Sequence, residues 1–395
     1  MELTELRKEN ELVDLFCSMA EVPSPSLKEE KMIDWVYNYC KSHNLQCELD
    51  DFKNIYINVP ATDSTKQPLL LSSHMDVVGD DSPVIPYLDG DLIKAKGRTL
   101  GADDKAGVAN ALYFANELNQ RTDIKHGGLE VHFTRDEENT MQGIKHTDFS
   151  RIKSKYALVL DSDALGQCLI SGASYVLVDL KVTAPKGGHS GNDIGDPTRE
   201  NAAKLIADLV SDMPQGVFYS ENGQVVTSCN IGGITSGDTS ITNVINTEGY
   251  VTYSIRSSNK QKEKELIALM QETADFFNKE YEGIATADIK FTEKMPMFEK
   301  NEDEFMPNLF SKVAKQIGVE PEISSFHAGA ETHIYANRTN ANGEKFSPYL
   351  LGLATVCNMH SAREYLDYKT MIKGQELLRE LFLEFNKIKF GKKLS

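Results

Sequence analysis

The sequence is poor in cysteine, and its cysteines are not paired. Six cysteines are scattered over 395 residues, and none forms a C-x-x-C motif. This pattern argues against a disulfide framework and against a sulfur-ligated zinc site, and it favours buried thiols in a reducing compartment. Any metal site is therefore expected to use nitrogen and oxygen ligands.

Long apolar runs are also missing. No window approaches the roughly 18 uninterrupted apolar residues of a membrane-spanning helix. The first segment, MELTELRKENELVDLF, is charged from its second residue and has no apolar core of the kind found in signal peptides. We therefore expect a cytoplasmic protein that has no membrane partner.

Basic residues are the minority among the charged ones. Lys and Arg total 42 against 59 Asp and Glu, which gives a formal net charge of −17. This balance argues against nucleic acid and anionic membranes as partners. No glycine-rich phosphate loop, internal repeat or low-complexity tract is visible. The length of 395 residues favours two domains, and 40% hydrophobic with 26% charged residues is ordinary for a globular enzyme.

Alternating strand and helix patterns occupy the first part of the chain. Residues 1–45 predict two helices, the second starting at the Ser26–Glu29 segment SLKE, which has a capping-box pattern. Between about residues 54 and 175 the segments NIYINV, PLLLSSH, LIKAKG, LEVHFT and YALVLD predict strands, and GVANALYFANEL predicts a helix. Such alternation indicates a mixed, mostly parallel sheet covered by helices, in the α/β class.

The pattern changes near Tyr175. Residues 174–295 predict the order β-α-β-β-α-β, which is the ferredoxin-like α+β arrangement. Helix and strand signals resume afterwards. We therefore expect a discontinuous catalytic domain, residues 1–173 and 296–395, with an inserted domain at residues 174–295.

Residues that can bind a metal ion follow the apolar runs of the first expected domain. Because the carboxyl ends of parallel strands meet in one crevice, these side chains are expected to converge. The candidates are His74, Asp76, Glu137, Glu138, Asp161 and His360, together with Asp103 and Asp104 at the start of a predicted helix. A crevice that collects histidines and carboxylates predicts a metal site.

Each candidate also has an ordinary structural explanation. The H-x-D spacing of His74 and Asp76 is a weak signal, although it puts both side chains on one side and lets the aspartate hold the imidazole. Asp103 and Asp104 could cap a helix, or one of them could bridge two metal ions. We expect at most one of these adjacent aspartates to face the pocket.

Two adjacent glutamates offer two different roles. Glu137 and Glu138 could form a solvated acidic turn, or one could bind metal while the other serves as general base. Asp163 is an alternative to Asp161, and a lone histidine such as His360 often has only a structural role. A metal with an open position lowers the pKa of bound water to about 7, and two metals about 3.5–4 Å apart can hold both nucleophile and substrate. Together the candidates predict metal-assisted hydrolysis.

Several motifs occur in an order typical of one enzyme family. They are HMDVV, TLGADDKAG, FTRDEEN, LDSD, GGHSG, IRSS and NMHSAREY. With them the chain resembles, over nearly its whole length, the zinc exopeptidase family that contains peptidase T, aminoacyl-histidine and carnosinase-type dipeptidases, glutamate carboxypeptidase and succinyl-diaminopimelate desuccinylase. TLGADDKAG and HGGLEVHFTRDEE most resemble peptidase T-like members, whereas GGHSG and HAGAE resemble the aminoacyl-histidine dipeptidases.

The resemblance implies a centre of two zinc ions, with cobalt or manganese as alternatives. By this resemblance His74 and Asp161 would hold one ion, and Glu138 and His360 would hold the other. Asp103 would bridge the two ions, Asp76 would orient His74, and Glu137 would be the general base.

The resemblance also implies that the inserted domain is a lid that carries a homodimer contact. His189 would stabilise the oxyanion, from the same subunit or from a partner. Asn243 and Arg256 would bind the peptide substrate, with Arg256 pairing with its terminal carboxylate. Glu331, in the dipeptidase-like SFHAGAE stretch, is a further substrate-binding candidate.

The function expected from these patterns is a metallo-exopeptidase that hydrolyses short peptides, a tripeptide or dipeptide aminopeptidase like peptidase T. One alternative is an aminoacyl-histidine-type dipeptidase or an N-acyl amino acid deacylase on the same site. A second alternative is a non-catalytic binding protein that uses the inserted domain for assembly.

Overall fold

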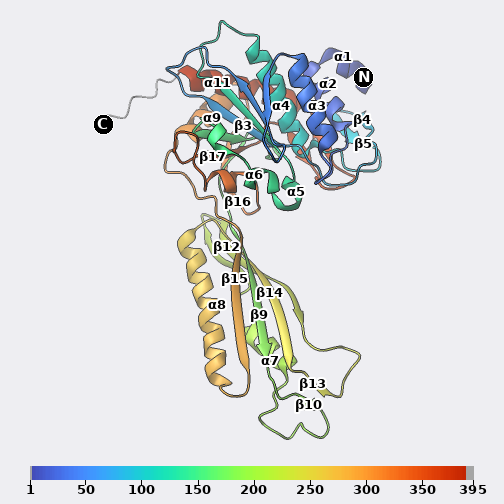
Figure 1. Ribbon diagram of the computed structural model, residues 1–395, viewed down its shortest axis with the longest axis vertical. Helices are drawn as coiled ribbons and strands as arrows, with labels where there is room; N and C mark the ends of the chain where they lie inside the picture. The colour runs from blue at the N-terminus through green and yellow to red at the C-terminus, as the bar shows by residue number, and fades with distance from the viewer. Residues whose placement is uncertain (1, 388–395) are drawn as a thin grey trace, which may run out of the picture. The chain divides into compact units, whose positions relative to one another are not determined.

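The chain divides into two units, which are described separately (Figure 1). The computed structural model describes residues 2–387. Within them, unit 1 takes residues 2–170, 300–325 and 330–387, and unit 2 takes residues 171–299 and 326–329.

The main sheet of unit 1 has eight strands in the order β1-β2-β6-β3-β7-β17-β8-β16. They are β1 (Gln46–Leu49), β2 (Ile55–Val59), β3 (Leu69–His74), β6 (Leu129–Thr134), β7 (Tyr156–Val159), β8 (Gln167–Gly172), β16 (Glu322–Phe326) and β17 (Ser347–Leu351). The four central strands, β6, β3, β7 and β17, are parallel. The pairs β1–β2, β2–β6 and β17–β8 are antiparallel.

The composition of the central strands explains their place. Every residue of β3, β7 and β17 is buried. Parallel strands that are covered on both faces require near-continuous apolar runs of this kind. The three strands therefore form the rigid centre from which the loops at their carboxyl ends project.

Helices cover this sheet. They are α1 (Leu3–Glu9), α2 (Glu11–Ala20), α3 (Glu30–Ser42), α4 (Ala102–Asn119), α9 (Phe305–Gln316) and α11 (Tyr368–Lys387), with short helical turns α5 (Glu137–Thr140), α6 (Gln142–Lys145), η1 (Phe149–Arg151) and α10 (Thr332–Tyr335). Helices α2, α4 and α11 contact one another, and α4 lies against β3.

The beginning of the chain differs from its prediction. It forms three helices instead of two, because the Asn10 side chain accepts a hydrogen bond from the Val13 N–H at 3.0 Å. This N-cap starts α2 and separates it from α1.

A second, four-stranded sheet of unit 1 brings distant loops together. It has the order β18-β19-β5-β4, formed by β4 (Pro86–Asp89), β5 (Leu92–Ala95), β18 (Thr355–Cys357) and β19 (Tyr365–Asp367). The sequence pattern predicts β5 in the main, mostly parallel sheet, and this prediction is wrong. Its burial alternates, which suits a sheet with one covered face. Its antiparallel pairing with β19 places the loop before β19 near the start of α4.

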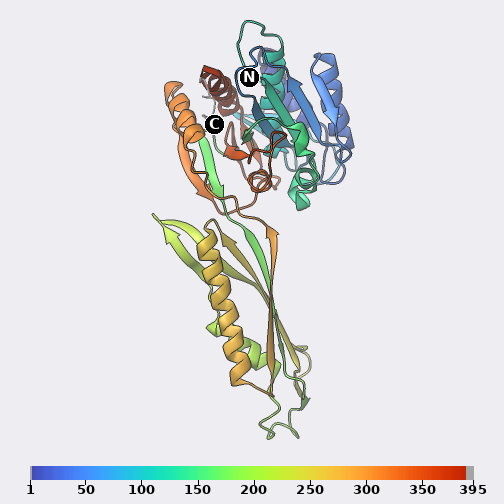
Figure 2. The ribbon, with the colours of Figure 1, turned by 60° about the vertical axis from the view of Figure 1, so that its left-hand side comes forward.

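Unit 2 is an antiparallel sheet of order β11-β12-β14-β9-β15 with two helices (Figure 2). Its elements are β9 (Tyr175–Thr183), α7 (Ala202–Asp212), β11 (Gly216–Glu221), β12 (Gln224–Thr235), β14 (Glu248–Ser257), α8 (Lys260–Glu280) and β15 (Thr286–Met295), and a short ribbon pairs β10 (Gly188–His189) with β13 (Val244–Ile245). Burial alternates along β9 and β14, and their buried side chains pack with α7 and α8. The predicted α/β class with an inserted ferredoxin-like unit is confirmed.

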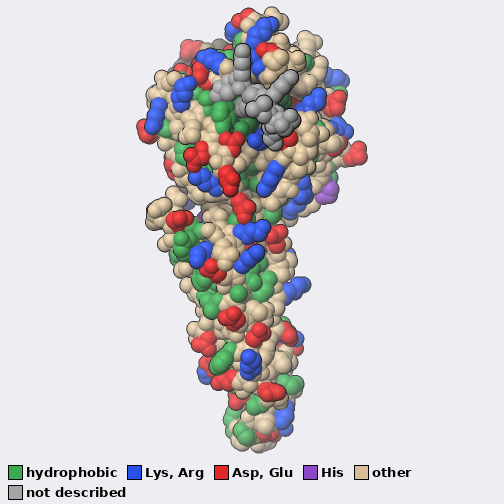
Figure 3. All heavy atoms as spheres, turned by 90° about the vertical axis from the view of Figure 1, so that its left-hand side faces the viewer, with side chains coloured by type: hydrophobic (Ala, Val, Ile, Leu, Met, Phe, Trp, Pro, Cys, Tyr) green, Lys and Arg blue, Asp and Glu red, His purple; other side chains and the backbone are tan. Residues whose placement is uncertain are grey.

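The surface carries mixed charges. Acidic and basic side chains are interspersed on the face of unit 1 in Figure 3. Within residues 2–387, none of the helices combines the length and the apolar content that crossing a bilayer requires.

Candidate metal centre

The candidate residues of unit 1 lie at the carboxyl ends of adjacent parallel strands. His74 is the last residue of β3, which has β6 and β7 as its two neighbours. Glu137 and Glu138 follow β6, and Asp161 follows β7. The buried strands therefore fix the starting points of these four side chains on one edge of the sheet.

His74 is held by the backbone and the carboxylate of Asp76. Its Nδ1 lies 2.9 Å from the Asp76 carbonyl oxygen and 3.5 Å from Asp76 Oδ1. An imidazole held through Nδ1 presents Nε2 to whatever lies beyond it. In this site Nε2 lies 3.3 Å from Asp103 Oδ1 and 3.6 Å from Asp161 Oδ1.

Asp76 also holds the turn that carries both glutamates. Its carboxylate accepts the Glu137 N–H at 2.9 Å and the Glu138 N–H at 3.1 Å. The Ser26 hydroxyl donates to the same carboxylate at 2.7 Å. One buried aspartate thus orients an imidazole and two glutamates.

The capping box predicted at residues 26–29 does not form. The hydroxyl of Ser26 donates to Asp76 instead of capping α3. The carboxylate of Glu29 accepts the Asp136 N–H at 3.0 Å and pairs with Arg135 at 2.6 Å. Glu29 therefore supports the loop after β6 directly, and Ser26 supports it through Asp76.

Asp103 lies between the two histidines. Its Oδ1 faces His74, and its Oδ2 is 3.1 Å from Nε2 of His360. The same His360 nitrogen is 3.0 Å from Glu138 Oε1. Carboxylate oxygens of Asp103, Glu138 and Asp161 thus converge on the two imidazole Nε2 atoms, and within residues 2–387 no lysine or arginine forms an ion pair with them.

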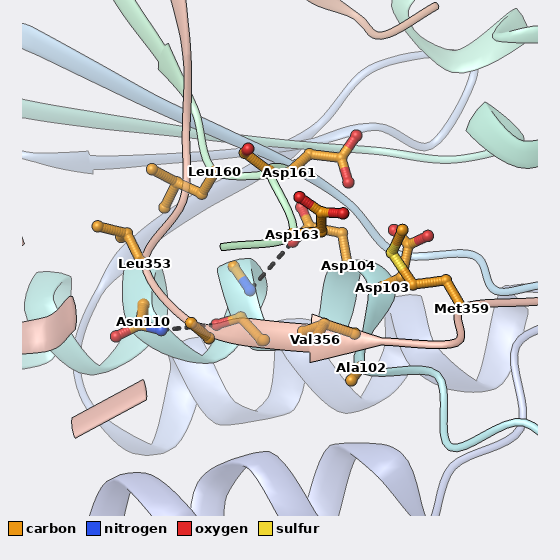
Figure 4. Close-up of a pocket in the computed structure, with 14 residues that line it drawn as sticks. Ala102, Asp103, Asp104, Asn110, Leu160, Asp161, Asp163, Leu353, Val356 and Met359 are labelled. Carbon is orange, nitrogen blue, oxygen red and sulfur yellow. Dashed lines mark hydrogen bonds between the residues drawn. The ribbon is translucent and has the colours of Figure 1, made fainter. Parts of the chain in front are cut away.

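Asp103 and Asp104 both line the same small cavity, which has a volume of about 20 Å³ (Figure 4). The expectation that only one of them could face the pocket is therefore wrong. Both have non-helical dihedral angles at the start of α4, and a carboxylate oxygen of each lies within 4.8 Å of a His74 ring nitrogen. Asp104 Oδ1 accepts the Gly107 N–H at 3.1 Å. A Cβ at Gly107 would lie 2.3 Å from that oxygen, so the approach requires glycine.

The protonation of the cluster reflects its crowded, buried charge. Burial raises the pKa of Asp161 to about 6 and that of Glu138 to about 7. Hydrogen bonding to Asp103 raises the pKa of His360 to about 9. Burial opposes the charge of His74, but Asp161 and Asp103 raise its pKa well above the usual range. Without a metal ion the two imidazoles therefore favour the protonated form, and a bound cation would displace those protons.

The donor set fits a divalent metal. Ligand atoms of His74, Asp103 and Glu138 lie within 4.8 Å of one another, and so do those of His74, Asp104 and Asp161. Imidazole nitrogens and carboxylate oxygens are the ligands that zinc and neighbouring transition metals accept in hydrolytic enzymes. His74 belongs to both groups, so the two groups form one continuous cluster.

Glu137 and Glu331 are further acids beside this cluster. Burial raises the pKa of Glu137 well above its usual range, and the charges of Asp161 and Glu331 raise it further. Glu331 is 1% exposed, and burial raises its pKa to about 7. The Ser72 hydroxyl lies 3.5 Å from Glu331 Oε2, and Tyr335 donates to Ser72 at 3.0 Å. Glu331 is thus part of the buried interior of unit 1.

The other substrate-binding candidates belong to unit 2. His189 and Asn243 are neighbours at the β10–β13 ribbon, where the Ser190 N–H donates to the Asn243 carbonyl at 3.0 Å. Arg256, on β14, lies over the Tyr175 ring at 4.3 Å. Their roles in binding substrate stay predictions.

Sequence reasoning missed the buried carboxylates that support the ligand-bearing loops. The sequence pattern predicts Glu29 as part of a helix cap, and it gives Glu364, within the motif NMHSAREY, no role. Most of their partners are backbone N–H groups, which carry no side-chain signature. An acid within an otherwise buried segment is the signal that could have indicated them, because such a charge requires partners.

We predict that Asp76→Asn weakens metal binding. An amide has only one acceptor oxygen. Its NH₂ group would therefore face one of the N–H or O–H groups that now donate to the Asp76 carboxylate. Loss of a partner that orients a metal ligand typically lowers metal affinity about 10–100-fold. Calorimetric titration of the metal-free protein with Zn²⁺ measures this change.

Asp63→Asn is a matched control, because the half-buried Asp63 carboxylate also accepts a backbone N–H and a hydroxyl, both from Thr65, and contacts none of the candidate ligands. Equal zinc affinities for the two variants would contradict the role of Asp76.

The chain matches known proteins over most of its length. Residues 70–384 match the model of Peptidase family M20/M25/M40. Peptidase T of Listeria monocytogenes is 25% identical over 396 aligned residues, which cover 96% of this chain and 88% of the relative. The cytosol non-specific dipeptidase of Escherichia coli is 29% identical over 213 residues, and this match spans only 46% of the chain and 43% of that relative.

A solved structure supports the fold. The crystal structure of aminopeptidase PepT from Bacillus cereus aligns with a TM-score of 0.84 at 24% identity, covering 95% of this chain and 98% of that one. The family is metal-dependent, and hydrolysis of short peptides is the activity that membership supports. The chain belongs to the metallopeptidase family M20/M25/M40.

Proposed function

We propose that the protein is a dinuclear metallo-exopeptidase that removes residues from short peptides with a free amino terminus. The observation that carries this proposal is the position of Asp103, whose two carboxylate oxygens face the Nε2 atoms of His74 and His360. A carboxylate placed between two sets of ligands is suited to bridge two metal ions.

The ligand assignment follows from these contacts. We assign His74 and Asp161 to one metal ion, Glu138 and His360 to the other, and Asp103 to both. When bound, two such ions polarise the scissile carbonyl and lower the pKa of the attacking water. We propose zinc as the metal, with cobalt or manganese as alternatives. Asp104, which lies within reach of His74 and Asp161, is a further acid of the first site.

Glu137 is assigned as the general base. Its backbone N–H is fixed by Asp76, and its half-buried carboxylate lies beside the candidate ligands. From this place the carboxylate can accept a proton from the attacking water and deliver it to the leaving amine. The neighbouring Glu138 contacts His360, so the two glutamates take different roles.

The choice of substrate rests on the relatives. The names of similar proteins, an aminopeptidase, a tripeptidase and a cytosol dipeptidase, support tripeptides or dipeptides with a free amino terminus as substrates. N-acyl amino acid deacylation on the same centre is the second candidate. We further propose that the protein acts in the cytoplasm. The contributions of His189, Asn243, Arg256 and Glu331 to substrate binding, and a homodimer through unit 2, stay predictions.

A peptide panel tests the proposed activity. Metal-free protein, prepared with a chelator, is expected to be inactive on Ala-Ala-Ala, Ala-Ala and β-Ala-His, and to regain activity when two equivalents of Zn²⁺, Co²⁺ or Mn²⁺ are added. N-acetylated forms of the same peptides are expected to be cleaved poorly. Preference for the acetylated forms would favour the deacylase, and a reloaded protein that cleaves neither set would overturn the proposal.

A further inference from the structure

Glu364 has a buried carboxylate with several hydrogen-bond donors and no assigned function. The side chain is 1% exposed. Its Oε1 accepts the N–H groups of Ala102 at 2.8 Å and Asp103 at 3.2 Å. Its Oε2 accepts the Gly101 N–H at 2.9 Å and the hydroxyl of Thr99. One carboxylate therefore binds the whole segment that leads into Asp103.

These donors have few other partners. The first N–H groups of a helix have no acceptor within the helix, and a buried N–H without an acceptor is costly. Within the segment that starts α4, the Glu364 carboxylate supplies the acceptors, and its negative charge is favourable at this end of the helix. The backbone conformation at Asp103 thus depends on an acid that lies 261 residues further along the chain.

The same short segment carries His360. The Glu364 N–H donates to the Ser361 carbonyl at 3.1 Å, and the Ser361 hydroxyl donates to the Asn358 carbonyl at 2.7 Å. These bonds form a tight turn between β18 and β19, and this turn contains both His360 and Glu364. At the far side of this turn His360 Nε2 meets Asp103 Oδ2 at 3.1 Å.

We propose that Glu364 is the positioning residue that sets the distance between Asp103 and His360 before any metal is bound. The Glu364 carboxylate binds the backbone N–H of Asp103, and the Glu364 backbone belongs to the turn that contains His360. A single residue therefore fixes the positions of both ligands. This inference rests on the proposed function, because it assigns Asp103 and His360 as metal ligands. Within residues 2–387, Glu364 forms no hydrogen bond with the side chain of either ligand, and it acts through the backbone.

Glu364→Gln is the sharpest test, because it keeps the size of the side chain. Glutamine has one acceptor oxygen and two N–H donors, so its NH₂ group would face either Gly101 and Thr99 or Ala102 and Asp103. We expect the dissociation constant for Zn²⁺, measured by calorimetry on metal-free protein, to rise about 10–100-fold. With excess metal, kcat is expected to return toward the wild-type value and KM for the peptide to stay unchanged.

Glu130→Gln is a matched control. The carboxylate of Glu130 likewise accepts backbone N–H groups, from Lys153 at 3.0 Å and Ser154 at 2.8 Å, but it lies near the opposite end of β6 from the candidate ligands. This variant is expected to lose thermal stability without a change in zinc affinity. Equal zinc affinities of the Glu364 and Glu130 variants would overturn the positioning role.

A milder variant tests the same proposal if Glu364→Gln does not fold. Thr99→Val removes one donor to the carboxylate and keeps the charge, and it is expected to weaken zinc binding in the same direction by a smaller factor. Wild-type affinity in that folded variant would contradict the proposal. A wild-type protein that binds two zinc ions but cleaves no peptide would overturn the proposed function alone, because the zinc affinities still decide the role of Glu364.

Discussion

Glu137→Gln is expected to lower kcat for a tripeptide about 10²–10⁴-fold while the protein keeps both metal ions. The substitution removes the group that accepts the proton of the attacking water, and it leaves every assigned ligand in place. The backbone N–H of residue 137 still donates to Asp76, so the turn between β6 and α6 is preserved. Metal content by elemental analysis and steady-state kinetics on the same sample measure the two effects.

Glu138→Gln provides the comparison. It changes the adjacent residue, whose backbone is held by the same aspartate, but whose carboxylate oxygen lies 3.0 Å from His360 Nε2. This variant is expected to weaken metal binding, which separates it from the Glu137 variant. Near-normal kcat in metal-loaded Glu137→Gln would exclude Glu137 as the general base.

Asp103→Asn is expected to abolish the dinuclear centre. Both oxygens of the carboxylate are in use, one toward His74 and the other toward His360, and asparagine supplies only one. Metal content is expected to fall below two ions per chain. Loss of metal-based stabilisation worth several kcal/mol corresponds to a decrease in kcat/KM of about 10³-fold or more.

The control for this variant is Asp104→Asn, at the adjacent position of the same helix start. Asp104 is not the proposed bridge, and its Oδ1 already accepts the Gly107 N–H at 3.1 Å. It is expected to keep two metal ions and to lose less activity. Two retained metal ions in Asp103→Asn, with normal kcat/KM, would show that Asp103 is not the bridge.

The sequence predicted the part of the centre that depends on local patterns. Apolar runs identified the strands that became β3, β6 and β7, and parallel neighbours in one sheet necessarily end on the same edge. The grouping of His74, Glu138 and Asp161 follows from this geometry. A histidine, aspartate or glutamate that directly follows such an apolar run is therefore enough to predict a candidate metal ligand.

The remaining contacts depend on distant pairings. The antiparallel register of β5 with β19 brings Glu364 to the start of α4, and no local periodicity encodes that register. The same holds for Ser26, whose spacing to Glu29 imitates a capping box although its hydroxyl donates to Asp76. The sequence patterns do not predict strand β11, because its residues GVFYSE do not alternate between apolar and polar.

The contact between the Asp103 loop and the His360–Glu364 turn joins segments that are separated by the whole of unit 2. During synthesis the ribosome releases Asp103 long before His360, so a growing chain holds only part of the centre. Contacts of such sequence separation form late, because a long loop must first be closed. The native metal site is therefore expected to assemble only after translation of the final segment. Partial chains released earlier would carry no functional catalytic centre.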